Sequence, residues 1–66
     1  MSKQELLSDP VVRMLLEDVK TYLAGDKSLL SEAKRSIGIL KKEYKIGPSF
    51  VADACDAGLG EVSEVW

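Results

Sequence analysis

The fold of this chain depends first on residues 9–25, which read DPVVRMLLEDVKTYLAG. Asp9 is suited to cap the first free amides of a helix, and Pro10 fits the first helical position, where no amide donor is needed. At about 100° per residue, one arc holds Val11, Val12, Leu15, Leu16, Val19, Tyr22 and Leu23. Gly25 follows as the expected left-handed stop. This stretch predicts an amphipathic helix over residues 10–24.

A second amphipathic helix is predicted over residues 29–45. Its shared apolar arc consists of Leu29, Leu30, Ala33, Ile37, Leu40 and Tyr44. Gly38 lies off this stripe and the helical phase is the same on both of its sides, so we favour one helix, straight or bent there. A break at Gly38 with Ser36 as a new cap is the alternative, because glycine costs about 1 kcal/mol relative to alanine.

A corner over residues 46–49, IGPS, separates this helix from a third one predicted over residues 49–57. Proline cannot continue the preceding helix. The apolar side of the third helix consists of Phe50, Val51, Ala54 and Cys55, and Gly58 and Gly60 are expected to end it. Residues 1–8 and 59–66 are expected to be flexible ends or to be ordered by a partner. For the C-terminal end a strand, a helix extension and an arm stay open.

These elements predict an all-α fold in one small domain, residues 1–66. Helices 10–24 and 29–45 pair antiparallel, and helix 49–57 packs across one end. A chain of 66 residues buries only about 60% of its unfolded surface. Self-association or a partner subunit is therefore expected to contribute to its stability.

The composition excludes several classes of protein. With one cysteine and no histidine, neither an internal disulfide nor a metal site is expected. No apolar run approaches the roughly 20 residues of a membrane helix, and the N-terminus lacks the apolar region of a signal peptide. A free thiol without an export signal indicates a cytoplasmic or other intracellular setting, which includes virus- and plasmid-encoded proteins.

Few residues are suited to catalysis. Asp53 and Asp56 lie three apart on one side of a helix, and exposed surface carboxylates explain them better than an acid–base pair in a pocket. Cys55 lacks a histidine partner and is expected to be a small buried hydrophobic residue rather than a reactive thiol. Gly58-Leu59-Gly60 lacks the lysine of a phosphate loop. The sequence predicts no enzyme, no cofactor and no small-molecule substrate.

Charge is segregated along the chain, although the formal net charge is only −2. Residues 34–45 carry five cations and one acid, and residues 46–66 carry four acids and no cation. The five cations are Lys34, Arg35, Lys41, Lys42 and Lys45. Two interpretations stay open: a flank that binds phosphates with salt-sensitive affinity for nucleic acid, or a solvated face balanced by acids elsewhere.

Seven apolar side chains fall outside the three inner stripes and are candidates for a partner-facing surface: Leu6, Leu7, Met14, Ile39, Val62, Val65 and Trp66. The three other aromatic residues are expected in the core. Trp66 has two interpretations of equal weight. It either folds back over the helices or anchors a partner, because tryptophan is favoured at interface hot spots.

Residues 40–55, LKKEYKIGPSFVADAC, resemble the two-helix core of helix-turn-helix domains. The residues at the apolar and turn positions of that pattern are Leu40, Tyr44, Ile46, Gly47, Val51 and Cys55. The wider segment 36–58, SIGILKKEYKIGPSFVADACDAG, is similar to the gamma domain of the bacterial DNA translocase FtsK, a winged helix. In that family the second helix enters the major groove. Here it carries Asp53 and Asp56 and no Arg, Lys, Asn or Gln, and little chain follows for a wing.

The sequence therefore favours a non-catalytic binding module that acts through protein–protein contacts, as a homo-oligomer or an accessory subunit. The alternative is a helix-turn-helix type of nucleic-acid-binding protein that holds phosphates through the cations of residues 34–45. The dependence of binding on salt concentration distinguishes these two hypotheses. Phosphate binding weakens steeply with salt, whereas an apolar interface weakens little or strengthens.

Overall fold

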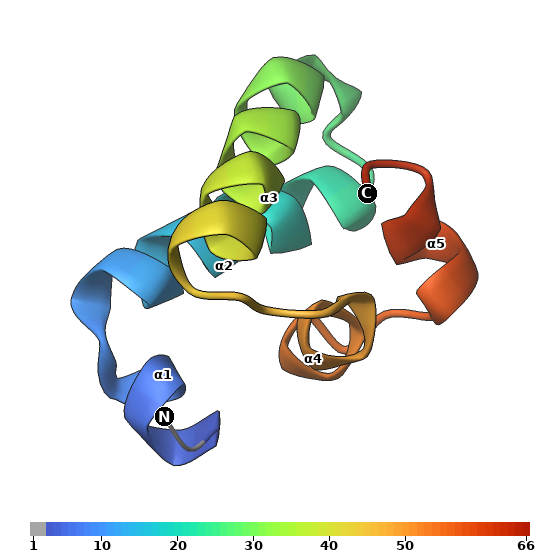
Figure 1. Ribbon diagram of the computed structural model, residues 1–66. Coiled ribbons are helices and arrows are strands. Elements are labelled where there is room, and N and C mark those ends of the chain that lie inside the picture. Colours follow the sequence, from blue (N-terminus) through green and yellow to red (C-terminus); the bar gives the residue numbers. More distant parts are fainter. Residues whose placement is uncertain (1–2) are drawn as a thin grey trace.

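The computed structural model describes residues 3–66, and within that range every regular element is helical. The elements are α1 (Lys3–Ser8), α2 (Pro10–Leu23), the 3₁₀ helix η1 (Lys27–Leu29), α3 (Leu30–Glu43), α4 (Pro48–Ala54) and α5 (Leu59–Ser63) (Figure 1). The prediction of an all-α chain is confirmed. The described part holds five α-helices where the sequence predicted three, because both ends are helical too.

Both ends of α2 follow from local sequence chemistry. The carboxylate of Asp9 accepts a hydrogen bond from the amide of Val11 at 2.8 Å, and Pro10 stands in the first turn. Gly25 has a positive φ of 130°. Its amide donates to the carbonyl of Tyr22 at 3.1 Å, which satisfies an end carbonyl that has no partner inside the helix. The buried face of α2 consists of Val12, Leu16, Val19 and Tyr22. Val11, predicted to be on that face, is half exposed.

Helix α3 runs through Gly38 without a break, so the alternative with a new cap at Ser36 is wrong. Ser36 is buried inside the helix, and its hydroxyl donates to the carboxylate of Asp18 at 3.5 Å. The buried face of α3 consists of Ala33, Ser36, Ile37 and Leu40. Leu30, predicted to be on that face, is exposed at the first position of the helix.

Gly38→Ala is expected to stabilise the protein. Gly38 lies in the interior of α3, and a methyl group there would meet no atom within 4 Å. Alanine favours a helix by about 1 kcal/mol over glycine, so the midpoint of thermal unfolding should rise by about 4–8 °C. Gly25→Ala is the matched control and should lower the midpoint, because alanine is strained at that positive φ. A fall at both positions would contradict a continuous α3.

The corner between α3 and α4 turns through Lys45, which has a left-handed φ of 57°. The amide of Ile46 then reaches back to the carbonyl of Leu40 at 3.1 Å. Gly47 precedes α4, and Pro48 stands in its first turn. The predicted corner is therefore present but lies earlier in the chain: α3 ends at Glu43, two residues before the predicted end at residue 45, and α4 begins at Pro48.

The end of α4 differs from the prediction, which placed it at residue 57 with two glycines as the stop. Asp56 takes the left-handed position instead, with φ 53°. Its amide donates to the carbonyl of Asp53 at 3.2 Å, and that of Ala57 donates to the carbonyl of Ala52 at 2.9 Å. This pair of bonds is the Schellman pattern, which ends α4 early. Gly58 is extended and precedes α5.

The two chain ends are ordered as short helices rather than as a frayed lead-in and an arm. Leu6 of α1 is buried, and so are Val62 and Val65 of the α5 region. These three belong to the core and not, as predicted, to a partner-facing surface. For the two valines the reason is their spacing of three: Val65 lies in the turn that continues α5 and faces the core on the same side as Val62. Residues 1–2, part of the predicted lead-in, lie outside the described residues.

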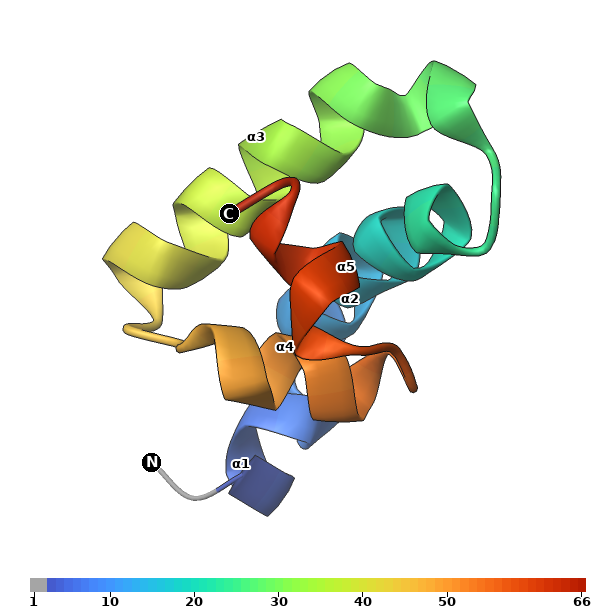
Figure 2. The same cartoon turned by 90° about the vertical axis from the view of Figure 1, so that its right-hand side faces the viewer.

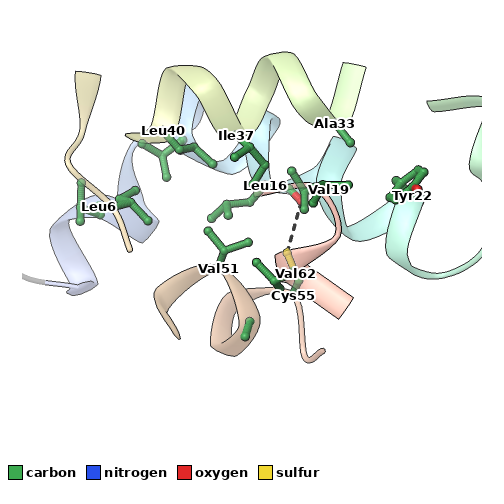
Figure 3. Packing of buried hydrophobic residues seen from close by; sticks show 14 residues of the cluster. Leu6, Leu16, Val19, Tyr22, Ala33, Ile37, Leu40, Val51, Cys55 and Val62 are labelled. Carbon is green, nitrogen blue, oxygen red and sulfur yellow. Dashed lines mark hydrogen bonds between the residues drawn. The ribbon is translucent and has the colours of Figure 1, made fainter. Parts of the chain in front are cut away.

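One buried cluster joins all five α-helices (Figure 3). Figure 3 shows Ala33 beside Val19, Ile37 beside Leu16, and Leu40 on the side of Leu6. Figure 2 shows α5 between α3 and α4, with the C-terminus beside α3. The core is therefore closed by the two ends of the chain.

Candidate binding surfaces

Four of the seven predicted interface side chains stay at the surface, to different degrees. Met14 is 70% exposed, the most open large apolar residue among those described. Leu7 and Ile39 are half-buried on α1 and α3. Trp66 is also half-buried and packs against the core cluster. Met14 is thus far more exposed than the other candidates for the partner-facing surface.

Trp66 folds back onto α3, which was one of its two sequence interpretations. The ammonium group of Lys41 donates to the backbone oxygen of Trp66 at 2.9 Å and lies 5.0 Å from the centre of the indole ring. A groove of about 330 Å³ lies beside this contact, lined by residues that include Lys34, Gly38 and Glu64. The carboxylate of Glu64 makes the groove a poor anion site, because it lowers the positive potential of the two lysines.

The five cations predicted as a phosphate-binding set are all exposed. Lys34, Arg35, Lys41 and Lys42 project from α3, whereas Lys45 follows the helix in a left-handed turn. Lys45 therefore lies outside the helix that carries the other four cations. We call the four cations on α3 the basic flank.

The hydrogen bond between Ser36 and Asp18 identifies the flanks along which α2 and α3 meet. At about 100° per residue, Val11 and Met14 lie within about 60° of Asp18 around α2. By the same geometry Glu32, Ile39 and Glu43 lie within about 60° of Ser36 around α3. We call this outer surface the α2–α3 seam; it consists of Val11, Met14, Asp18, Glu32, Ile39 and Glu43.

The seam combines exposed apolar groups with carboxylates. Val11 and Met14 stand one turn apart, 50% and 70% exposed. Glu32 and Glu43 are exposed on the other helix, and Asp18 is half-buried between. Lys34 and Lys41 lie on the opposite flank of α3, about 180° from the two glutamates. Arg35 and Lys42 lie about 60–100° from the same glutamates, so the basic flank extends from the far side of α3 to the border of the seam.

The residues weighed for catalysis do not form a reactive group. Asp53 on α4 and Asp56, which follows the end of that helix, are both exposed. Cys55 is buried, its thiol donates to the carbonyl of Leu16 at 3.7 Å, and burial raises its pKa to about 11. Among residues 3–66, no three His, Cys, Asp or Glu side chains gather as a metal site. No helix in the described range is long and apolar enough to span a bilayer.

Cys55 is expected to react about 100-fold more slowly with iodoacetamide at pH 8 than an unhindered thiol, because its pKa of about 11 keeps it protonated. The sign of the pH effect follows from the same shift. The folded thiol keeps a proton that the unfolded chain loses near pH 9, so stability should fall between about pH 9 and pH 11. Mass spectrometry of alkylation, with a urea-unfolded control, measures the rate. Equal rates in both states would contradict the burial of Cys55.

Comparison of the chain with protein-family models, with curated proteins and with solved structures finds no match. What the chain binds is therefore inferred from its own surfaces. Two of them are candidates: the α2–α3 seam and the basic flank.

Proposed function

We propose that this chain is a non-catalytic binding module that acts through protein–protein contacts, as a homo-oligomer or an accessory subunit, and that the α2–α3 seam is its contact surface. The supporting observation is that Met14 and Val11 are 70% and 50% exposed, one helical turn apart, although the core is closed without them. Exposed apolar side chains gathered in one place mark interaction surfaces. Methionine is well suited to this role because it is unbranched and adapts to a partner.

In this proposal α2 and α3 act as the antiparallel pair predicted from the sequence, and α4 packs across one end of it. The order of buried side chains supports the pairing, since Ala33 lies beside Val19 and Leu40 lies farther along, toward Leu6 (Figure 3). Such a pair presents Met14 and Ile39 on the same outer surface. A partner docked there would add buried apolar area to a domain that is small for its stability.

Site-specific photo-crosslinking tests this proposal in the cells that make the protein. A benzophenone amino acid replaces Met14 in one variant and Leu59 in the other. Leu59 is the matched control because it is also an exposed apolar side chain, at 55% against 70% for Met14, but lies on α5. We expect a discrete adduct, with a second copy or another chain, from position 14 and not from position 59. No adduct from position 14, or the same adducts from both, would overturn the proposal.

A second candidate function is nucleic-acid binding of the helix-turn-helix type through Lys34, Arg35, Lys41, Lys42 and Lys45. The observation in its favour is that all five cations are exposed. The resemblance of residues 36–58 to helix-turn-helix domains belongs to this candidate. In such domains the second helix reads bases; here Asp53 on α4 and Asp56 just after it are exposed carboxylates, so the contacts would be to phosphates.

Fluorescence anisotropy with a labelled DNA duplex tests this second candidate. Phosphate contacts predict an affinity that falls steeply as salt rises, and its loss in the double variant Arg35→Glu with Lys42→Glu. That pair is chosen because it leaves the contact between Lys41 and Trp66 in place. No binding at about 150 mM salt, or an unchanged affinity in the double variant, would exclude the candidate.

A further inference from the structure

We propose that copies of this chain associate head to tail, with the α2–α3 seam of one copy against the basic flank of the next. This inference rests on the proposed function, because it names the partner of the seam. The charges support it. The seam carries Asp18, Glu32 and Glu43 around its apolar centre, and the flank carries four exposed cations. Opposite charges that face each other across an interface fix its orientation and speed its formation.

The two lysines of the basic flank that lie farthest from the seam cannot reach it within one molecule. Lys34 and Lys41 lie about 180° around α3 from Glu32 and Glu43, whereas Arg35 and Lys42 lie about 60–100° from the two glutamates and border the seam. The attraction of the seam for Lys34 and Lys41 is therefore satisfied only between copies. Each molecule offers one acidic and one basic surface, so association leaves a free surface at either end.

The basic flank also has apolar area to offer. Leu30 is exposed at the start of α3 on the same side as Lys34. Trp66 is half-buried beside Lys41. The long stems of lysine side chains cover apolar surface while their charged ends stay in water. Met14 and Val11 would thus meet apolar groups on the partner, with the charges arranged around them.

A two-fold symmetric dimer is disfavoured by the same charges. Seam against seam would bring the carboxylates of both copies together, and flank against flank would bring the cations together. Like charges in contact cost free energy. A head-to-tail contact avoids both and generates a ring if the rotation closes, or an open chain if it does not.

Two blocked variants test this arrangement by sedimentation velocity. Met14→Lys blocks the seam by placing a cation against the basic flank. Lys34→Glu with Lys42→Glu blocks the flank and leaves the bond between Lys41 and Trp66 in place. All three positions are exposed, and circular dichroism checks that each variant keeps its helical spectrum. Met14→Gln, a neutral polar change, is the control for loss of the apolar side chain alone.

The average mass of the unmodified chain is expected to rise with protein concentration and to fall as salt is raised from about 50 to about 500 mM. Each blocked variant should associate at least 10-fold more weakly, and Met14→Gln should lose less than Met14→Lys. Mixing the two blocked variants should give a 1:1 complex of twice the monomer mass, because each keeps the surface that the other lacks. This mixture is the decisive measurement.

Three outcomes would overturn the inference. The first is a monomer at all concentrations up to about 1 mM. The second is a flank variant that still dimerises like the unmodified chain, which means a symmetric seam contact. The third is a pair of blocked variants that do not combine. If the chain is monomeric but position 14 crosslinks to a different protein, the proposed function stands, and only the inference that the partner is a second copy of this chain is wrong.

Discussion

Leu40→Ala is expected to lower the free energy of unfolding by about 3–4 kcal/mol, within the range of 2.7–5 kcal/mol for buried leucines. Leu40 is fully buried in the cluster that joins α3 to the other helices, on the side of Leu6 (Figure 3). A single core in a chain of this size rarely supplies more than about 3–5 kcal/mol. The variant should therefore be largely unfolded at 37 °C.

Urea unfolding followed by circular dichroism measures this loss. Leu59→Ala is the matched control, because it removes the same atoms from a side chain that is 55% exposed. Its cost is expected to stay below about 0.5 kcal/mol. Equal losses in the two variants would mean that α3 does not bury Leu40 against α2.

The second large effect is expected from Val62→Asp, which tests whether the end of the chain belongs to the core or faces a partner. Val62 is fully buried on α5. A carboxylate at this position would lose its hydration and gain no hydrogen-bond partner or counter-charge, which costs several kcal/mol of folding stability. We expect the variant to lose its cooperative unfolding transition. If Val62 instead faced a partner, as its sequence position first indicated, the variant would fold and only association would suffer.

The control for this variant is Val11→Asp, the same substitution at a half-exposed valine near the start of α2. It should keep the stability of the unmodified chain, since an acid is favourable in the first turn of a helix. Thermal unfolding by circular dichroism compares the two, and Trp66 fluorescence reports whether the end of the chain still packs. A stable Val62→Asp with unchanged Trp66 emission would contradict the placement of α5.

The long helices could be predicted because their signals are local. Asp9 and Pro10 mark the start of α2, Gly25 marks its end, and the apolar period between them identifies its buried face. The same apolar period predicted that α3 continues through Gly38 without a break. Ile46 to Pro48 gave the corner, because a proline excludes further helix at that point.

The short helices could not be predicted in the same way. A helix of six or five residues, such as α1 or α5, has little stability of its own. It forms because Leu6, Val62 and Val65 are buried by other parts of the chain. The spacing of the two valines was a signal in the sequence, but it fits several short structures until the neighbouring helices are in place.

The candidate site also combines features that could be predicted from sequence with features that could not. Met14, Ile39 and the cations of the basic flank were each recognised from sequence as lying outside the inner stripes. That Met14 and Ile39 share a seam with Glu32 and Glu43, opposite Lys34 and Lys41, emerged only from the packing of α2 on α3. The periodicity of a sequence determines the angle of each side chain around its own helix axis. Which neighbour covers that angle depends on contacts between distant segments, and these only the tertiary structure decides.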